Sequence, residues 1–271
     1  AVASKFLAAG AVVSWARAGV GAVATQALAK VGYGPDGLDM LASGMSAEET
    51  LAKLIAADPG SAERQMGIVD TKGGAAAHTG SECFDWAGHI VGEGFTCQGN
   101  ILTGELVVNA MASAYRTTEG ELADRLVSAL MAGDRAGGDR RGKQSAAVMV
   151  MKPGGGYGGD NDHYMDLRVD DHMDPVTQLA ELLQAHHPFF GTPDPADQLA
   201  INADIARELQ TILIEQDYMQ GDADGTWDEL TKQAFWALVG NENLEERWNI
   251  HGQTDRIDRV ALEYLRKRFA K

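Results

Sequence analysis

A basic, glycine-containing loop at residues 137–147 holds the side chains best suited to chemistry. It carries Asp139, Arg140 and Gln144 and runs directly into the apolar segment 148–151. Its glycines can adopt backbone conformations with positive φ that other residues avoid. Backbone N–H groups and arginine forks at the mouth of a strand can bind a carboxylate, a phosphate or an amide. The alternative is a solvated hairpin loop whose arginines only maintain solubility.

Further polar side chains stand near the ends of predicted strands: Ser4, Lys5, Thr25, Gln26, Gln98 and Asn100. Where two sheets face each other, strand ends meet at one cleft. We therefore expect one pocket to be lined by Asp139, Arg140, Gln144, Ser4 and Gln26, with Asn100 at its rim. A lysine beside a strand-borne serine can orient a base. An arginine paired with Asp139 would be rigid, and its fork would suit a substrate carboxylate.

Aspartates and histidines crowd the segment 160–174, and such side chains can bind Mn²⁺, Mg²⁺ or Zn²⁺. Along a strand, Asp166 and Asp170 share a face, whereas Asp171 points the other way. A solvated strand end followed by a helix N-cap at Asp174 explains the same residues. We therefore predict no metal site. The sequence also lacks a P-loop, a dinucleotide-binding fingerprint and a nucleophile-elbow motif, so no cofactor is expected.

Composition excludes several classes of protein. The 271 residues carry a formal net charge of −16, which argues against binding to nucleic acid or to an anionic membrane. Two cysteines, Cys83 and Cys97, provide no disulfide framework, and reduced thiols are expected. Lys5 and Arg17 interrupt the apolar N-terminal region, leaving stretches shorter than the roughly 20 residues of a membrane-spanning helix. With no signal pattern either, we expect a cytoplasmic protein.

The first 190 residues show a mixed pattern of strands and helices. Strands are predicted at residues 1–6, 19–25, 64–69, 75–79, 95–98, 145–151 and 164–169, with residues 15–17 in a link. Helices are predicted from residue 34, after the capping box Ser46–Glu49, and at residues 105–116, 119–131 and 175–186. The helix at 119–131 is expected to stop at Gly133. This grouping suits two stacked sheets with helices outside, because βαβ repeats would alternate. Residue 1 already has the character of mid-strand, so a segment is expected before it.

A linker rich in proline and glycine, residues 189–195, separates this region from a pattern that is helical throughout. Helices are predicted at residues 201–216, 227–239, 244–248 and 257–269. We therefore expect domains at 1–188 and 199–271, joined by a linker at 189–198.

The turn Asp222–Gly225 begins like a calcium loop but has no further ligands and no closing glutamate, so a tight polar turn is the better interpretation. Taken with the apolar residues around it, from Leu209 to Phe235, the turn resembles a helical peptidoglycan-binding module. In that module a Tyr–Gly–Asp-Gly turn precedes a helix that opens near a threonine. Trp227 stands where the module usually has a glycine. The resemblance implies a glycan or protein partner for residues 199–271.

The segments 1–6, 17–26, 33–38, 85–88, 98–100, 137–147 and 166–172 together resemble the uncharacterised DUF1028 family, which is assigned to the Ntn-hydrolase superfamily. The resemblance covers residues 1 to about 188. It implies an αββα sandwich, α+β in class, followed by a small all-α domain. It also implies a mechanism in which an N-terminal Thr, Ser or Cys attacks an amide with its own α-amine as base. Residue 1 is Ala, so the nucleophile is expected in a leading strand that precedes it.

Two functions of different kinds remain open. The first is hydrolysis of a small amide or peptide, with Ser4, Lys5, Asn100 and Asp139 in catalysis. Substrate binding would then fall to the remaining candidates, Thr25, Gln26, Gln98, Arg140 and Gln144. The second is a non-catalytic protein that binds a ligand or partner on the same scaffold. A homo-oligomer is expected in either case, and the native first residue distinguishes the two functions.

Overall fold

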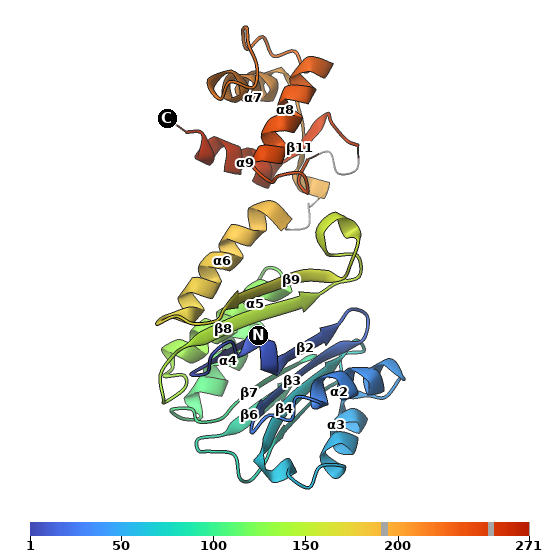
Figure 1. Cartoon of the computed structure of the whole chain (residues 1–271), viewed down its shortest axis with the longest axis vertical. Coiled ribbons are helices and arrows are strands. Elements are labelled where there is room, and N and C mark those ends of the chain that lie inside the picture. Colours follow the sequence, from blue (N-terminus) through green and yellow to red (C-terminus); the bar gives the residue numbers. More distant parts are fainter. Residues whose placement is uncertain (191–194, 249–251, 271) are drawn as a thin grey trace. The chain divides into compact units, whose positions relative to one another are not determined.

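The computed structural model describes residues 1–190, 195–248 and 252–270 (Figure 1). The chain divides into two compact units, Ala1–Leu183 and Gln184–Lys271, here called the N-terminal and C-terminal units. In the described part of the chain, no helix combines the length and apolar character needed to cross a membrane.

The first sheet of the N-terminal unit is antiparallel, in the order β2-β3-β4-β5. Its strands are β2 (Ser14–Arg17), β3 (Gly21–Ala27), β4 (Arg64–Asp70) and β5 (Ala75–Thr79). Helices α2 (Tyr33–Ala42) and α3 (Ala47–Ala56) cover one face, and their apolar side chains form a core with Val23, Met66 and Ile68 (Figure 1). The predicted capping box begins α3, since Ser46 Oγ accepts from Glu49 N and Ser46 N donates to the Glu49 carboxylate.

The second sheet has the antiparallel order β1-β8-β9, comprising β1 (Val2–Ser4), β8 (Ser145–Met151) and β9 (His163–Val169). Alternate residues of β8 bury against helices α5 (Leu122–Arg135) and α6 (Pro175–Phe190). Ala147, on the other face of β8, packs with Val13 of the short helix α1 (Gly10–Val13) and with Ala24 of the first sheet. The two sheets therefore face each other across a thin apolar layer.

A two-stranded ribbon, β6 (Gly88–Gly92) and β7 (Phe95–Gly99), lies beside helix α4 (Leu106–Thr117) (Figure 1). Phe95 and Cys97 pack against Ala112 and Tyr115 of α4 and against Ala129 of α5. One pair of helices, α4 and α5, thus contacts both this ribbon and the second sheet. Two single-turn helices, Ser61–Glu63 and Tyr157–Gly159, complete the elements of this unit, and a third, Pro195–Asp197, belongs to the C-terminal unit.

Three sequence predictions for the N-terminal unit were wrong in detail. Residues 15–17 belong to β2 and pair with β3. Trp15 also packs on Gly34 of α2, where any side chain would collide with the indole ring. Strand β6 was not predicted. Helix α5 continues past Gly133, since this glycine admits the Met111 side chain and does not end the helix; the chain turns only at Gly137, with φ of +117°.

The C-terminal unit contains helices α7 (Ala203–Glu215), α8 (Glu229–Asn241) and α9 (Arg259–Arg268) around one apolar core. It is not helical throughout, as β10 (Gln198–Ala200) pairs with β11 (Arg256–Asp258). Residues 245–248 form turns in place of the helix predicted at 244–248, and Trp248 N donates to Leu244 O. Of the predicted linker, residues 191–194 lie outside the described residues.

Candidate functional site

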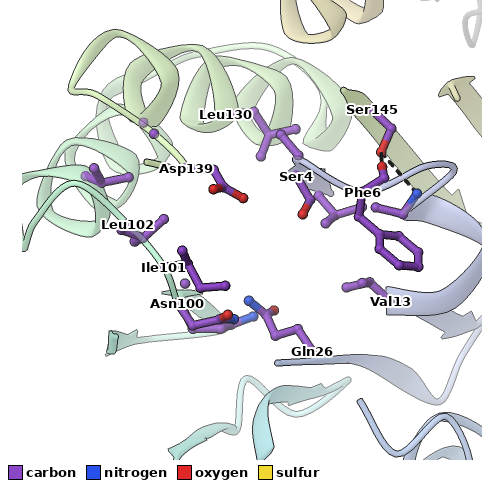
Figure 2. A pocket seen from close by; sticks show the side chains of 18 of the residues that line it. Ser4, Phe6, Val13, Gln26, Asn100, Ile101, Leu102, Leu130, Asp139 and Ser145 are labelled. Atoms are coloured by element: carbon purple, nitrogen blue, oxygen red, sulfur yellow. Dashed lines mark hydrogen bonds between the residues drawn. The ribbon is translucent and has the colours of Figure 1, made fainter. Parts of the chain in front are cut away.

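A cavity of about 870 Å³ lies in the N-terminal unit, where both sheets meet the loop that follows α5 (Figure 2). Much of its wall is formed by residues 1–4 at the start of the chain, residues 26–29 at the end of β3 and just beyond it, and residues 96–102 of β7 and the turn that follows. Residues 137–139 and 141–143 close another side, while Val107, Met111 and Leu130 of α4 and α5 add apolar surface. The cavity is therefore large enough for a small organic molecule or a short peptide.

Two strand edges border this cavity. Within the described residues, β1 pairs only with β8, and β7 pairs only with β6. The second edge of each strand has no strand partner among the described residues, and residues of both strands line the cavity. An unpaired edge offers alternating N–H and C=O groups to an extended main chain.

A cluster of side-chain amides forms the floor of the cavity. Gln65 of β4 is completely buried, and its Oε1 accepts from Gln26 Nε2 and from Asn100 Nδ2, each at 3.0 Å. The Gln65 Nε2 lies 2.8 Å from Gly99 O and 3.1 Å from Gly88 O, and also contacts Thr79 Oγ1 at 2.9 Å. Figure 2 shows Gln26 and Asn100 side by side at the floor. Gln65 thus ties β4 to the β6–β7 ribbon and holds two cavity-lining amides in place.

Asp139 projects into the cavity from the opposite side (Figure 2). Arg141 donates to both carboxylate oxygens, from Nε at 3.0 Å and from Nη2 at 2.6 Å, and Lys5 N donates at 3.2 Å. Burial acts to raise the pKa of Asp139, but the hydrogen bonds from Arg141 and Lys5 outweigh it, and the pKa is lowered. Asp139 is therefore ionised at neutral pH, and it accepts the hydrogen bonds that the Arg141 guanidinium would otherwise offer to a ligand.

The other charged side chains of the cavity wall are also paired. Lys143 Nζ lies 2.6 Å from Asp134 Oδ2, and Arg64 Nε lies 3.1 Å from Asp58 Oδ2. Each cation that lines the cavity thus has a carboxylate partner. The wall as a whole presents little unbalanced charge.

Three groups near the cavity could act as nucleophiles, the hydroxyls of Ser4 and Ser145 and the thiol of Cys97. Ser145 Oγ donates to Phe6 O at 2.6 Å and accepts from Ala9 N at 3.1 Å, and these bonds hold the segment after β1 against β8 (Figure 2). Burial raises the pKa of Cys97 to about 11, so its thiol is protonated at neutral pH. The Ser4 side chain points into the cavity (Figure 2). A nucleophile needs to be activated by a base or by a lowered pKa, whereas the pKa of Cys97 is raised and Ser145 Oγ donates its proton to a backbone carbonyl.

The structure brings together five of the candidate residues named from the sequence. Ser4, Gln26, Gln98, Asn100 and Asp139 all line the cavity. The Gln98 Oε1 atom is itself buried and accepts no hydrogen bond from the described residues.

Four candidate residues lie elsewhere. Thr25 is completely buried and donates to Lys30 O, because neighbouring residues of a strand point to opposite faces and Gln26 takes the cavity side. Lys5 contributes its backbone N–H to Asp139, and its side chain is not among the lining groups. Gln144 donates to Asp171 Oδ1. The arginine that pairs with Asp139 is Arg141, not the expected Arg140, whose backbone N–H donates to Ile101 O.

Sequence reasoning missed Gln65, Arg141, Lys143 and Ser145. Of these, Gln65 left a signal in the sequence: it is a polar residue inside an otherwise apolar strand. A polar side chain buried at such a position must find hydrogen-bond partners, which makes it an organising residue.

The segment rich in aspartate and histidine does not gather around one point. Asp166 pairs with Arg168 of the same strand, and His172 Nδ1 accepts from Asp174 N. Among residues 1–190, 195–248 and 252–270, no group of three or more His, Cys, Asp or Glu side chains has the arrangement of a metal site. That the protein binds no metal ion therefore stays a prediction from the sequence.

Comparison with known proteins places the two units in separate groups. Residues 1–179 match the model of a family of unknown function, DUF1028, and residues 189–265 match that of a putative peptidoglycan binding domain. A crystal structure of protein SPO2555 from Silicibacter pomeroyi, described as matching DUF1028, shares 29% sequence identity and superposes with a TM-score of 0.63. The match covers 70% of this chain and 83% of that one. A search of curated proteins found no match.

Proposed function

This chain belongs to the DUF1028 family, and we propose that its N-terminal unit is an Ntn-type hydrolase of a small amide or peptide. The observation that carries the proposal is the convergence of Ser4, Gln26, Asn100 and Asp139, from four separate segments, on one cavity of about 870 Å³. Polar groups that meet in a partly apolar cavity are the usual mark of a binding or catalytic site. The four-layer αββα sandwich belongs to this proposal, and it is supported by the two facing sheets and the helices that cover them.

The strand edges that have no strand partner favour a substrate with an amide backbone. A peptide lying along β1 or β7 would satisfy main-chain N–H and C=O groups that have no partner in the neighbouring sheet. Apolar side chains of α4 and α5 would cover the rest of such a ligand.

The proposed reaction transfers the acyl group of the amide to the protein and then to water. An N-terminal Thr, Ser or Cys attacks the amide carbonyl, and its α-amine takes the proton. The C–N bond breaks as the leaving nitrogen receives that proton, and water then hydrolyses the acyl group. Residues 1–4 line the cavity, so a residue delivered alongside β1 would reach the bound amide. Asp139, ionised and held by Arg141, would orient polar groups of the substrate.

The test uses full-length natural protein and an amide-directed electrophile such as a β-lactone. Mass spectrometry of the digested product should locate the adduct on a Thr, Ser or Cys at the mature N-terminus, with Asp139→Asn slowing its formation. An Ala at the native N-terminus, or an adduct confined to surface lysines, would refute the hydrolase.

A non-catalytic binding protein is the second candidate. It is favoured by the hydrogen bonds of Ser145 and the raised pKa of Cys97, which leave both groups poor nucleophiles. In that case, small amides would bind the cavity and protect the N-terminal unit against unfolding, but no product would form.

For the C-terminal unit we propose binding to peptidoglycan, on the basis of its match to a putative peptidoglycan binding domain. Trp236 is a candidate for the contact, because its ring is half-exposed and rests on Trp248, and aromatic faces stack on sugar rings. Sedimentation of the full chain with purified sacculi tests this. Retention that Trp236→Ala abolishes supports the proposal, whereas equal recovery in the supernatant with and without sacculi contradicts it.

A further inference from the structure

We propose that Gln26 and Asn100 form a subsite that accepts both hydrogens of a primary carboxamide through their side-chain oxygens. This inference rests on the hydrolase proposed above and names its substrate class. It is based on which atoms of the amide cluster at the cavity floor donate hydrogen bonds and which accept them.

The orientation of the Gln65 amide is fixed by its neighbours. Gly88 O and Gly99 O can only accept hydrogen bonds, and both lie within 3.1 Å of the nitrogen end of Gln65. Turning the amide over would place oxygen against two carbonyl oxygens in a fully buried position. The nitrogen of Gln65 must therefore face the β6–β7 ribbon, and its oxygen must face the cavity floor.

The oxygen of Gln65 in turn fixes the two amides above it. Gln26 and Asn100 each approach that oxygen at 3.0 Å, and only an N–H group makes such a contact favourable. Each must therefore direct its NH₂ group towards Gln65. Since O and N of an amide point in different directions, their own oxygens are left for other partners. The hydrogen-bond network by itself fixes the orientation of all three amides.

No donor in the described part of the chain satisfies these two oxygens. Gln26 and Asn100 use only their side-chain nitrogens in hydrogen bonds with the described residues, and both residues line the cavity. Their shared contact with one atom of Gln65 keeps the two amides adjacent, as Figure 2 shows. Two neighbouring acceptors match the two hydrogens of one NH₂ group.

The charges around the cavity point to a neutral ligand. Arg141 donates to Asp139 and Arg64 donates to Asp58 and Leu28 O, so both guanidinium groups that line the cavity in the described residues are already bonded. Lys143 is paired with Asp134. The two amide oxygens at the floor and the ionised Asp139 across the cavity would each repel a carboxylate. The carboxylate-bearing substrate expected from the sequence is therefore replaced by an uncharged amide.

Benzamide, N,N-dimethylbenzamide, benzoate and benzylamine form a matched set of probes for the full chain. We expect benzamide to bind at least about fivefold more tightly than the other three in calorimetric titration, as the loss of one or two hydrogen bonds implies. Gln26→Met and Asn100→Leu should each remove most of that preference. Leu102→Met is the control, because Leu102 lines the same cavity, has no polar group, and is replaced by an apolar side chain of similar volume.

Several outcomes of these titrations would contradict the carboxamide subsite. Equal binding of benzamide and N,N-dimethylbenzamide, tighter binding of benzylamine or benzoate, or no binding of any probe at 20 mM (about the limit for a weak subsite) would overturn the inference. Thermal unfolding of each variant shows whether it is folded, and the two variants test the subsite independently. A benzamide preference without an N-terminal adduct would support the subsite and refute the hydrolase; an adduct without that preference would do the reverse.

Discussion

Replacing Gln65 by leucine tests whether one buried amide holds the cavity floor together. The side chain is completely buried, with two hydrogens facing Thr79, Gly88 and Gly99 and one oxygen facing Gln26 and Asn100. Two hydrogens and two lone pairs permit about four hydrogen bonds at once. At a net value of about 1 kcal/mol each, Gln65→Leu should destabilise the N-terminal unit by about 4 kcal/mol, and more where a buried carbonyl is left unpaired.

Differential scanning calorimetry of the full chain can measure this effect. For a unit of this size, about 4 kcal/mol corresponds to a Tm decrease of roughly 8–16 °C. The transition of the C-terminal unit should not move and serves as an internal reference. Gln178→Leu is the matched control, because Gln178 forms one exposed bond to Glu181. A decrease of less than about 2 °C for Gln65→Leu would refute the reasoning, as would an equal decrease for the control.

Four further predictions concern stability, pH and domain structure. The hydrogen bond from Tyr33 holds the pKa of Asp58 at about 2. The ionised Asp58 therefore stabilises the fold fully above the usual carboxyl pKa of about 4, and this stabilisation disappears as pH falls towards 2. Between pH 5 and pH 2.5, the measured Tm should decline less in Asp58→Asn than in the unchanged protein. Leu179→Ala, at a completely buried position, should cost about 2–5 kcal/mol in urea unfolding of the N-terminal unit. Asp258→Ala leaves buried Arg247 without its ion-pair partner and should cost the C-terminal unit about 3–5 kcal/mol, measured in the same way. From the linker composition, limited proteolysis should cut first between residues 188 and 198 and leave a stable N-terminal fragment; first cuts elsewhere would contradict that division of the chain.

Elements encoded by neighbours in sequence could be predicted well. Ser46 and Glu49 are three residues apart, and their reciprocal bonds begin α3 as expected. The turn after Asp70 and the apolar run of β8 were likewise visible, because turn chemistry and alternation are local properties. The predicted helix end at Gly133 was wrong, because this glycine makes room for the Met111 side chain between two helices. A glycine in the sequence looks the same whether it ends a helix or allows such a close contact.

Which side chains reach the cavity was decided by the tertiary structure. Arg140 and Arg141 are equivalent candidates in the sequence, but an isolated bridge between Leu102 and Asp139 fixes the loop so that Arg141 meets the carboxylate. The sequence determined that polar residues stand at the strand ends, and it determined the elements that carry them. The partners of Gln65 come from positions as far as 39 residues away, and only the packing of the sheet against the β6–β7 ribbon gives that amide its orientation.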